Sequence, residues 1–264
     1  MPLLNAAIVS HSPILIPEIG KLNRQVLKKT VAAYEEIAQE LQGNDIETII
    51  IISPHGQNIS DSFVINLGPE LKVDLSDFGF LGANKKFNSD LSFIDELKNK
   101  EDLNIKLISN DKLDYGASIP LYLLTAKLPD VKVVAINYSE VLNLEEHINL
   151  GKKITEVISS SAKKIAVIAS GDLSHRLKKN SPEGYSPKGA KFDNKLIEFL
   201  NNPETAVPNI LGFDNKLIKD ASECGLKSIV VLLGVLEDKK YEPEVLAYQT
   251  DFGIGYLTMN FKLD

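Results

Sequence analysis

The sequence predicts an α/β fold with one mixed β-sheet and helices on both of its faces, and three observations lead to this prediction. Short apolar runs rich in β-branched residues, typical of buried strands, alternate with longer segments of helical periodicity. Residues 62–75 and 244–261 each hold two such runs around a turn, which indicates antiparallel strands beside parallel ones. No internal repeat or linker divides the sequence, so residues 1–264 are expected to form a single domain.

The strands are predicted from apolar runs that are too short for helices. Four of these runs are expected to be fully buried: Leu4–Val9, Thr48–Ile52, Val131–Ile136 and Ile165–Ala169. Two further pairs of strands are predicted where turn residues interrupt the pattern. They are Ser62–Leu67 with Leu71–Leu75 around Gly68–Pro69, and the two halves of Glu244–Phe261 around Asp251–Gly255.

The helices are predicted from apolar residues spaced three and four positions apart. The segments concerned are Lys21–Leu41, Leu91–Lys98, Leu144–Ser159, Phe192–Leu200 and Ser222–Leu236. Gly43 is expected to end the first helix, Ser89 to cap the second and Asn143 to cap the third. The long polar loop Lys178–Lys188 is of the kind that often carries function in a compact domain.

Composition excludes several classes of protein. The formal net charge is −7, which argues against a nucleic-acid partner because such binding needs a basic surface. The longest apolar run, within Ile229–Leu236, is too short to span a bilayer, and the first residues do not resemble a signal peptide. A single cysteine suits a reducing compartment. We therefore expect a cytoplasmic protein without a membrane partner, and a homo-oligomer is compatible with this composition.

Three of the four histidines follow predicted buried strands. His11 follows the first strand, His55 the second, and His175 the strand that ends near Ala169. Ligands of open α/β sheets bind at the carboxyl ends of strands, so we expect these side chains at one edge. Each histidine alone could instead be a capping or solvent-facing residue, and the joint pattern favours a site. His147 lies among charged residues of a predicted helix and is expected to be exposed.

Two imidazoles and one carboxylate form a facial triad that suits Fe(II) and leaves positions open for substrate and dioxygen. His11 and His55 would supply the imidazoles. Glu223 is the candidate carboxylate, because it opens a helix whose remainder is strongly apolar and so lies at the edge of the core. Equally, Glu223 could only stabilise the first turn of that helix through the helix dipole.

Other catalytic classes fit the sequence less well. Ser170, Asp172, Ser174 and His175 supply the residue types of a serine hydrolase, but they are crowded into one loop and no Gly-x-Ser-x-Gly motif is present. Neither Gly-x-Gly-x-x-Gly nor a Walker loop occurs, which argues against a phosphate-binding protein. A metal-binding interaction protein without catalytic activity remains the main rival, because fold alone does not decide function.

Five short motifs occur in a fixed order along the chain: Ser-His-Ser-Pro at 10–13, Ser-Pro-His-Gly at 53–56, Gly-Asp-Leu-Ser-His at 171–175, Glu-Cys-Gly-Leu-Lys-Ser at 223–228 and Phe-Gly-Ile-Gly-Tyr at 252–256. Together they resemble the class III extradiol ring-cleavage dioxygenases. More closely, they resemble the superfamily of LigB-type catalytic subunits that also contains the Memo-like proteins. The resemblance extends from about His11 to Tyr256 and implies a LigB/Memo-like α/β domain.

The resemblance implies a non-haem Fe(II)-dependent dioxygenase that cleaves a catechol-type ring, with a small aromatic diol and O2 as partners. His11, His55 and Glu223 would be the metal ligands. His175 would act as acid and base near the substrate hydroxyl. We also expect Asp172, in the same Gly-Asp-Leu-Ser-His motif, to contact the substrate.

One position departs from the pattern of the family. The dioxygenases usually carry Asp-His-Gly before a Val-Pro-Leu segment, and here Asp114-Tyr115-Gly116 stands in that place. Tyr115 would take over the catalytic and substrate contacts of the histidine, but a phenol does not readily become a cation near neutral pH. The change favours another substrate, low turnover, or the Memo-like alternative.

Cys224 also favours the Memo-like alternative, because that branch places a cysteine near its metal. A thiolate would favour Zn or Cu over a catalytic iron. Its other interpretation is a small buried residue at a helix start.

Overall fold

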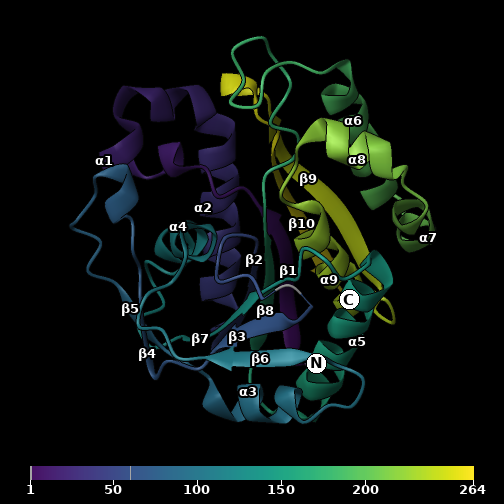
Figure 1. Cartoon of the computed structure of the whole chain (residues 1–264). Coiled ribbons are helices and arrows are strands. Elements are labelled where there is room, and N and C mark those ends of the chain that lie inside the picture. Colours follow the sequence, from purple (N-terminus) through teal and green to yellow (C-terminus); the bar gives the residue numbers. More distant parts are fainter. Residues whose placement is uncertain (1, 60) are drawn as a thin grey trace.

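The structure is a computed structural model of the chain, and it describes residues 2–59 and 61–264. Within these residues, eight strands form one mixed sheet in the order β6-β3-β7-β2-β8-β1-β10-β9 (Figure 1). The strand bounds are β1 Leu3–Val9, β2 Thr48–Ser53, β3 Phe63–Asn66, β6 Ile105–Ile108, β7 Lys132–Asn137, β8 Ile165–Ser170, β9 Tyr241–Gln249 and β10 Tyr256–Leu263. The predicted α/β class with a mixed sheet is confirmed.

The four central strands β7, β2, β8 and β1 are mutually parallel, so their carboxyl ends share one edge of the sheet. Antiparallel pairings lie on either side: β3 runs against β7, and β10 runs against β1 and β9. The central strands are buried on both faces, as expected for parallel strands covered by helices. This arrangement gathers the loops after β1, β2, β7 and β8 into one region.

Helices cover both faces of the sheet, as predicted. Their bounds are α1 Pro17–Gly20, α2 Lys28–Gly43, α3 Leu91–Lys98, α4 Tyr115–Leu124, α5 Leu144–Ser160, α6 Pro187–Leu200, α7 Ala206–Leu211, α8 Asn215–Ala221 and α9 Leu226–Leu236. Short 3-10 turns span Pro13–Leu15, Lys21–Leu27, Ser76–Phe78 and Asp251–Gly253, and β4 (Glu70–Lys72) pairs with β5 (Lys86–Asn88). Among the described residues, none of the helices has both the length and the apolar character needed to cross a membrane.

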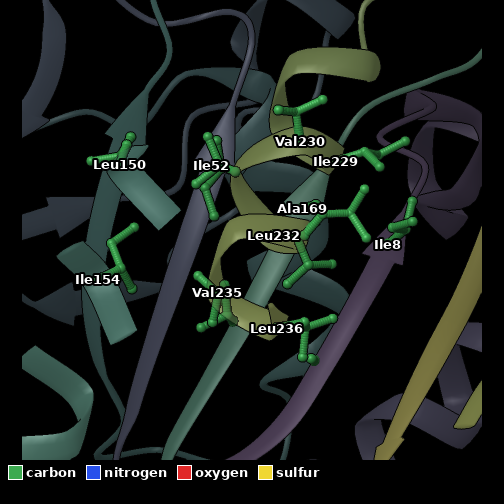
Figure 2. Packing of buried hydrophobic residues seen from close by; sticks show 14 of the residues in the cluster. Ile8, Ile52, Leu150, Ile154, Ala169, Ile229, Val230, Leu232, Val235 and Leu236 are labelled. Atoms are coloured by element: carbon green, nitrogen blue, oxygen red, sulfur yellow. The ribbon is translucent and has the colours of Figure 1, made fainter. Parts of the chain in front are cut away.

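A hydrophobic core lies on each face of the sheet. Alternate residues of β2 enter opposite cores: Ile50 and Ile52 face one, and Ile49 and Ile51 face the other. Figure 2 shows the first core, where strand residues lie against α9 and α5. The second core is built largely with α2 and α4. α9 packs against the sheet on one side and against α5 on another. Its nearly continuous apolar sequence suits burial on both sides.

Several predictions about local structure were wrong. The proposed hairpin of 62–67 with 71–75 does not form, because β3 joins the main sheet between β6 and β7 while β4 pairs with β5. All four residues of β3 are buried, and the short, partly exposed β4 could not cover them. The cap of α3 is Asp90, whose carboxylate accepts from Phe93 N at 3.3 Å, and not Ser89.

His147 was also predicted incorrectly. It is fully buried in α5, where its Nδ1 lies 2.6 Å from the Asn143 carbonyl and its ring contacts Phe63 and Tyr138 edge-on. Burial lowers its pKa to about 4, so it is a neutral core residue at neutral pH. The Asn143 cap next to it is confirmed: Asn143 accepts from Glu146 N while Glu146 accepts from Asn143 N.

Candidate metal site

The site lies at the carboxyl ends of three adjacent parallel strands. β8 pairs in parallel with both β1 and β2. His11, His55 and Asp172 each come two residues after the last residue of β1, β2 and β8, respectively. The shared edge therefore brings together side chains that are far apart in the sequence.

Three potential ligand atoms meet at this edge. His11 Nε2 lies 3.1 Å from His55 Nε2, and Cys224 Sγ lies 3.5 Å from His11 Nε2. The three ligand atoms are all within 4.8 Å of one another. The two imidazole rings meet edge to face, at an interplanar angle of 79°. The structure thus brings His11 and His55 together, as the strand-end argument predicted, and adds a thiol to them.

The proton of His11 is placed by a helix that contains a proline. Pro120, inside α4, has no N–H to donate to the carbonyl of Gly116 one turn earlier. The Ser170 hydroxyl donates to that carbonyl instead, at 2.5 Å. Because its single proton is used there, Ser170 Oγ must accept from His11 Nδ1–H, 3.1 Å away. His11 Nε2 therefore directs a lone pair into the site.

Cys224 reaches the site because two backbone segments approach closely. An ideal Cβ on Gly171 would lie 2.2 Å from the Cα of Gly225, so only glycine fits there. The contact holds the loop after β8 against the residues before α9. Cys224 N donates to the Asp172 carbonyl at 3.2 Å, and Asp172 N lies 3.4 Å from Cys224 Sγ. Burial raises the pKa of the Cys224 thiol, with the neighbouring Asp172 carboxylate acting in the same direction.

Glu223 does not join the cluster of ligand atoms. Its Oε2 accepts from Leu226 N at 2.6 Å, in the first turn of α9. Burial raises its pKa to about 7. The geometry therefore does not support Glu223 as the third ligand and matches the helix-dipole alternative. The neighbouring residue, Cys224, faces the histidines because the chain turns at Ser222, whose backbone is left-handed (φ 52°).

Asp172 is a buried carboxylate beside the two histidines. Its Oδ2 lies 3.8 Å from His11 Nε2. Its Oδ1 is buried and has no hydrogen-bond partner within the part of the chain that the structure describes. Burial raises the pKa of Asp172, and a hydrogen bond from Ser10 and the nearby histidines oppose that shift only in part. A buried carboxylate oxygen without a partner is the kind of atom that a cation would satisfy.

Aromatic and imidazole groups border the site. Tyr115, at the start of α4, stacks on His55 with ring centroids 4.2 Å apart, and Phe78 packs edge-on against Tyr115. Burial raises the pKa of Tyr115, so it is a neutral phenol. His175 Nδ1 donates to the carbonyl of Ser222 at 2.6 Å, so Nε2 is the ring nitrogen left for another partner.

The electrostatics favour neutral imidazoles. Burial lowers the pKa of His11 to about 3, and the charge of His175 adds to the effect. Burial also lowers the pKa of His55 to about 4, with a further contribution from His11. Both rings are therefore neutral at neutral pH, each with one N–H and one nitrogen lone pair, which is the form that binds a metal.

The donor set is two imidazoles and one thiol with a carboxylate nearby. Such N and S donors fit Zn(II) or Cu(I), for which thiolate and imidazole are preferred ligands. They differ from the two histidines and one carboxylate typical of catalytic Fe(II) sites. Sequence reasoning ranked Glu223 above Cys224, and no periodic signal distinguishes these adjacent residues.

The fold and this cluster define a mixed α/β protein with a metal-type site at the carboxyl edge of its sheet. Residues 5–259 match the family model of the catalytic LigB subunit of aromatic ring-opening dioxygenase, and the chain belongs to this LigB family. The resemblance seen in the motifs is confirmed at this level.

Individual relatives extend the comparison. The chain is 33% identical over 267 residues to Protein CA_C1420 of Clostridium acetobutylicum, an alignment that covers 97% of this chain and 56% of that protein. The chain thus spans about half the length of that relative. It is 25% identical over 208 residues to a 3,4-dihydroxyphenylacetate 2,3-dioxygenase of Escherichia coli, with 73% and 74% of the two chains covered.

A solved structure shares the fold. The crystal structure of the uncharacterized protein JW3007 from Escherichia coli K12 matches with a TM-score of 0.69 and 14% identity, over 97% of this chain and 99% of that one.

Proposed function

We propose that this chain is a metal-binding member of the LigB family in which His11, His55 and Cys224 hold one zinc or copper(I) ion. The observation that carries the proposal is the approach of their three ligand atoms to within 4.8 Å of one another. A bound ion of this kind supplies Lewis acidity or, for copper, one-electron chemistry. The Memo-like alternative is favoured over the Fe(II) centre because a thiol, and not the Glu223 carboxylate, lies beside the histidines.

The protein's own groups have defined tasks in this proposal. Ser170 keeps the proton of His11 on Nδ1, so that Nε2 is available to a cation. Tyr115 offers a flat apolar surface beside His55, against which an aromatic ligand would stack. His175 and Asp172 are the groups that would accept or return a proton at the site, because each has one ring or carboxylate atom that makes no hydrogen bond within the described chain.

A second candidate function is ring cleavage of a catechol-type diol with O2 at an Fe(II) centre. The family and the distant relative named as a dioxygenase favour it, since both concern aromatic ring opening. Asp172 would then supply the carboxylate, because its Oδ2 is 3.8 Å from His11 Nε2. Tyr115 would hold the diol ring in place of the usual histidine.

Anaerobic titration of the metal-free chain with Zn(II), Cu(I) and Fe(II) separates these functions, using two variants of adjacent residues. Cys224→Ser should weaken Zn(II) and Cu(I) binding by more than the ~10–100-fold typical of changes outside the ligand shell. Glu223→Gln is the matched control and should leave the affinities within about threefold, because its carboxylate bonds Leu226 N. The opposite ranking of the two variants would refute the proposed site. Turnover of catechol by the Fe(II)-loaded wild type would establish the second function.

A further inference from the structure

A polar pocket adjoins the metal site through His55. This imidazole lines the pocket together with Asn66, Asn110, Lys112 and Asn137, whereas His11 and Cys224 do not. Ile108, Leu113 and Ala135 form apolar parts of the wall. One imidazole is therefore the boundary between the candidate metal site and the pocket. Of the residues that line this pocket, only His55 belongs to the proposed metal site.

The amide groups of the pocket are oriented by the backbone so that donors face the ligand. Asn66 Oδ1 accepts from both Gly68 N and Asn110 N, each at 3.0 Å. The amide nitrogen Nδ2 of Asn66 is therefore a donor to which no described residue offers an acceptor. Asn66 itself is only 5% exposed. Asn110 Oδ1 accepts from Lys112 N at 3.1 Å, which likewise leaves its Nδ2 as a donor.

The charges that border the pocket are already compensated. Asp114 accepts from the Ser53 hydroxyl, from Ala117 N at 3.1 Å and from Asn137 Nδ2 at 3.1 Å. Lys112 pairs with Asp74, 2.6 Å away, on the exposed rim. The carboxylate of Asp114 is thus occupied by these three hydrogen bonds. The Nδ2 groups of Asn66 and Asn110 remain as donors for a ligand.

His55 presents one more polar atom. Its Nε2 faces His11, its ring face is covered by Tyr115, and Cδ2 lies on the side of Gly116. The remaining edge carries Nδ1, for which the described chain supplies no partner. When Nε2 binds a cation, the proton of the neutral ring must sit on Nδ1, which then becomes a donor. Metal-ligating histidines nearly always give this N–H to a carboxylate, carbonyl or water.

We propose that this pocket binds the carboxylate of a small, partly apolar organic acid through Asn66, Asn110 and His55, and that metal binding strengthens the interaction. The second part rests on the proposed metal site. Without a metal, His11 Nε2 is an acceptor, so the 3.1 Å contact requires His55 to carry its proton on Nε2. His55 Nδ1 is then a lone pair that repels a carboxylate. Occupation of the metal site at Nε2 moves this proton to Nδ1 of a ring that lines the pocket.

The test uses the full chain, first titrated with Zn(II) and then with benzoate or its neutral analogue benzamide. Because the chain has four histidines, their ring NMR signals report binding residue by residue. Benzoate should shift the ring signals of His55 and not those of His147, and should bind at least about 10-fold more tightly than benzamide. The affinity for benzoate should be at least about threefold lower in the zinc-free protein.

Asn66→Asp is the decisive variant, since Oδ1 can still accept from Gly68 N and Asn110 N while the donor is replaced by a charged acceptor. It should weaken benzoate binding at least about 10-fold. Asn209→Asp, an exposed position on α7 with the same change in charge, should leave it unchanged.

Equal binding of benzoate and benzamide, or full affinity in Asn66→Asp, would overturn the inference. Zinc binding without benzoate binding would refute the pocket alone. Failure to bind both zinc and copper(I) would refute the proposed function, and the part of this inference that depends on the metal with it.

Discussion

Asp193 on α6 gives the chain a pH-dependent stability that can be calculated. Its carboxylate is fully buried, where Oδ1 accepts from Ser174 N at 2.9 Å and Oδ2 from the Tyr248 hydroxyl at 2.7 Å. Burial raises its pKa from 3.8 to about 6, and the two hydrogen bonds oppose the shift only in part. The residue therefore anchors the loop that leads to His175, at the expense of burying an ionisable group.

The sign of the effect follows from which state holds the proton. Below pH 3.8 the carboxyl is protonated in both states, and its contribution to stability is fully present. As the pH rises from about 4 to 6, the unfolded state loses this proton while the folded state keeps it, so the free energy of unfolding falls. A shift of roughly two pH units at ~1.36 kcal/mol per unit amounts to about 3 kcal/mol, lost by pH 7.

The measurement is urea denaturation of the wild type and Asp193→Asn at several pH values between 3.5 and 8. Relative to the variant, the wild type should lose about 3 kcal/mol of unfolding free energy across this range. Asp130→Asn, a substitution at an exposed position, controls for the change in net charge. A difference between wild type and Asp193→Asn that is independent of pH, or that grows in the opposite direction, would refute the reasoning.

Three further predictions concern the surroundings of the site. Gly171→Ala should lower the unfolding free energy by ~1–3 kcal/mol and weaken zinc binding, because its Cβ would meet the Gly225 backbone at 2.2 Å. Gly43→Ala, whose Cβ meets nothing within 4 Å, is the control in both assays, and equal behaviour of the two variants would count against the tight contact. Asp114→Ala removes the cap of α4 and should lower the free energy of unfolding, measured by urea denaturation, by ~1–2 kcal/mol. A decrease below ~0.5 kcal/mol would contradict this prediction. His175→Gln should leave zinc affinity within about threefold, since its ring bonds a backbone carbonyl; a loss above ~10-fold would make it a ligand.

The central strands were predictable because their local composition agrees with their position in the fold. Continuous β-branched runs are buried on both faces of β2, β7 and β8, which is what a covered parallel sheet requires. The short strand β6 and the helix α4 were not predicted. β6 is only partly buried, and Gly116 and Pro120 in α4 disfavour a helix by local propensity. Tertiary packing and the Asp114 cap, together with the hydroxyl that satisfies the Gly116 carbonyl, override that preference.

The site was predictable to the extent that it depends on strand ends. His11 and His55 follow β1 and β2, two parallel strands on either side of β8, and the chain order of strands and histidines was enough to place them at one edge. The choice between Glu223 and Cys224 was not predictable in this way. It depends on the left-handed turn at Ser222 and on the glycine contact before α9, and neither has a periodic signature in the sequence.

The thiol beside the two imidazoles has a practical consequence for spectroscopy. Cys224 is the only cysteine in the sequence, and the chain contains no tryptophan. Any thiolate-to-metal charge-transfer absorption recorded after adding Co(II) must therefore originate at this position, against a near-ultraviolet background due mainly to tyrosine. Alkylation of thiols likewise has a maximum stoichiometry of one per chain. The chain thus carries a built-in optical and chemical reporter, with which occupancy of the site can be followed without introducing a label.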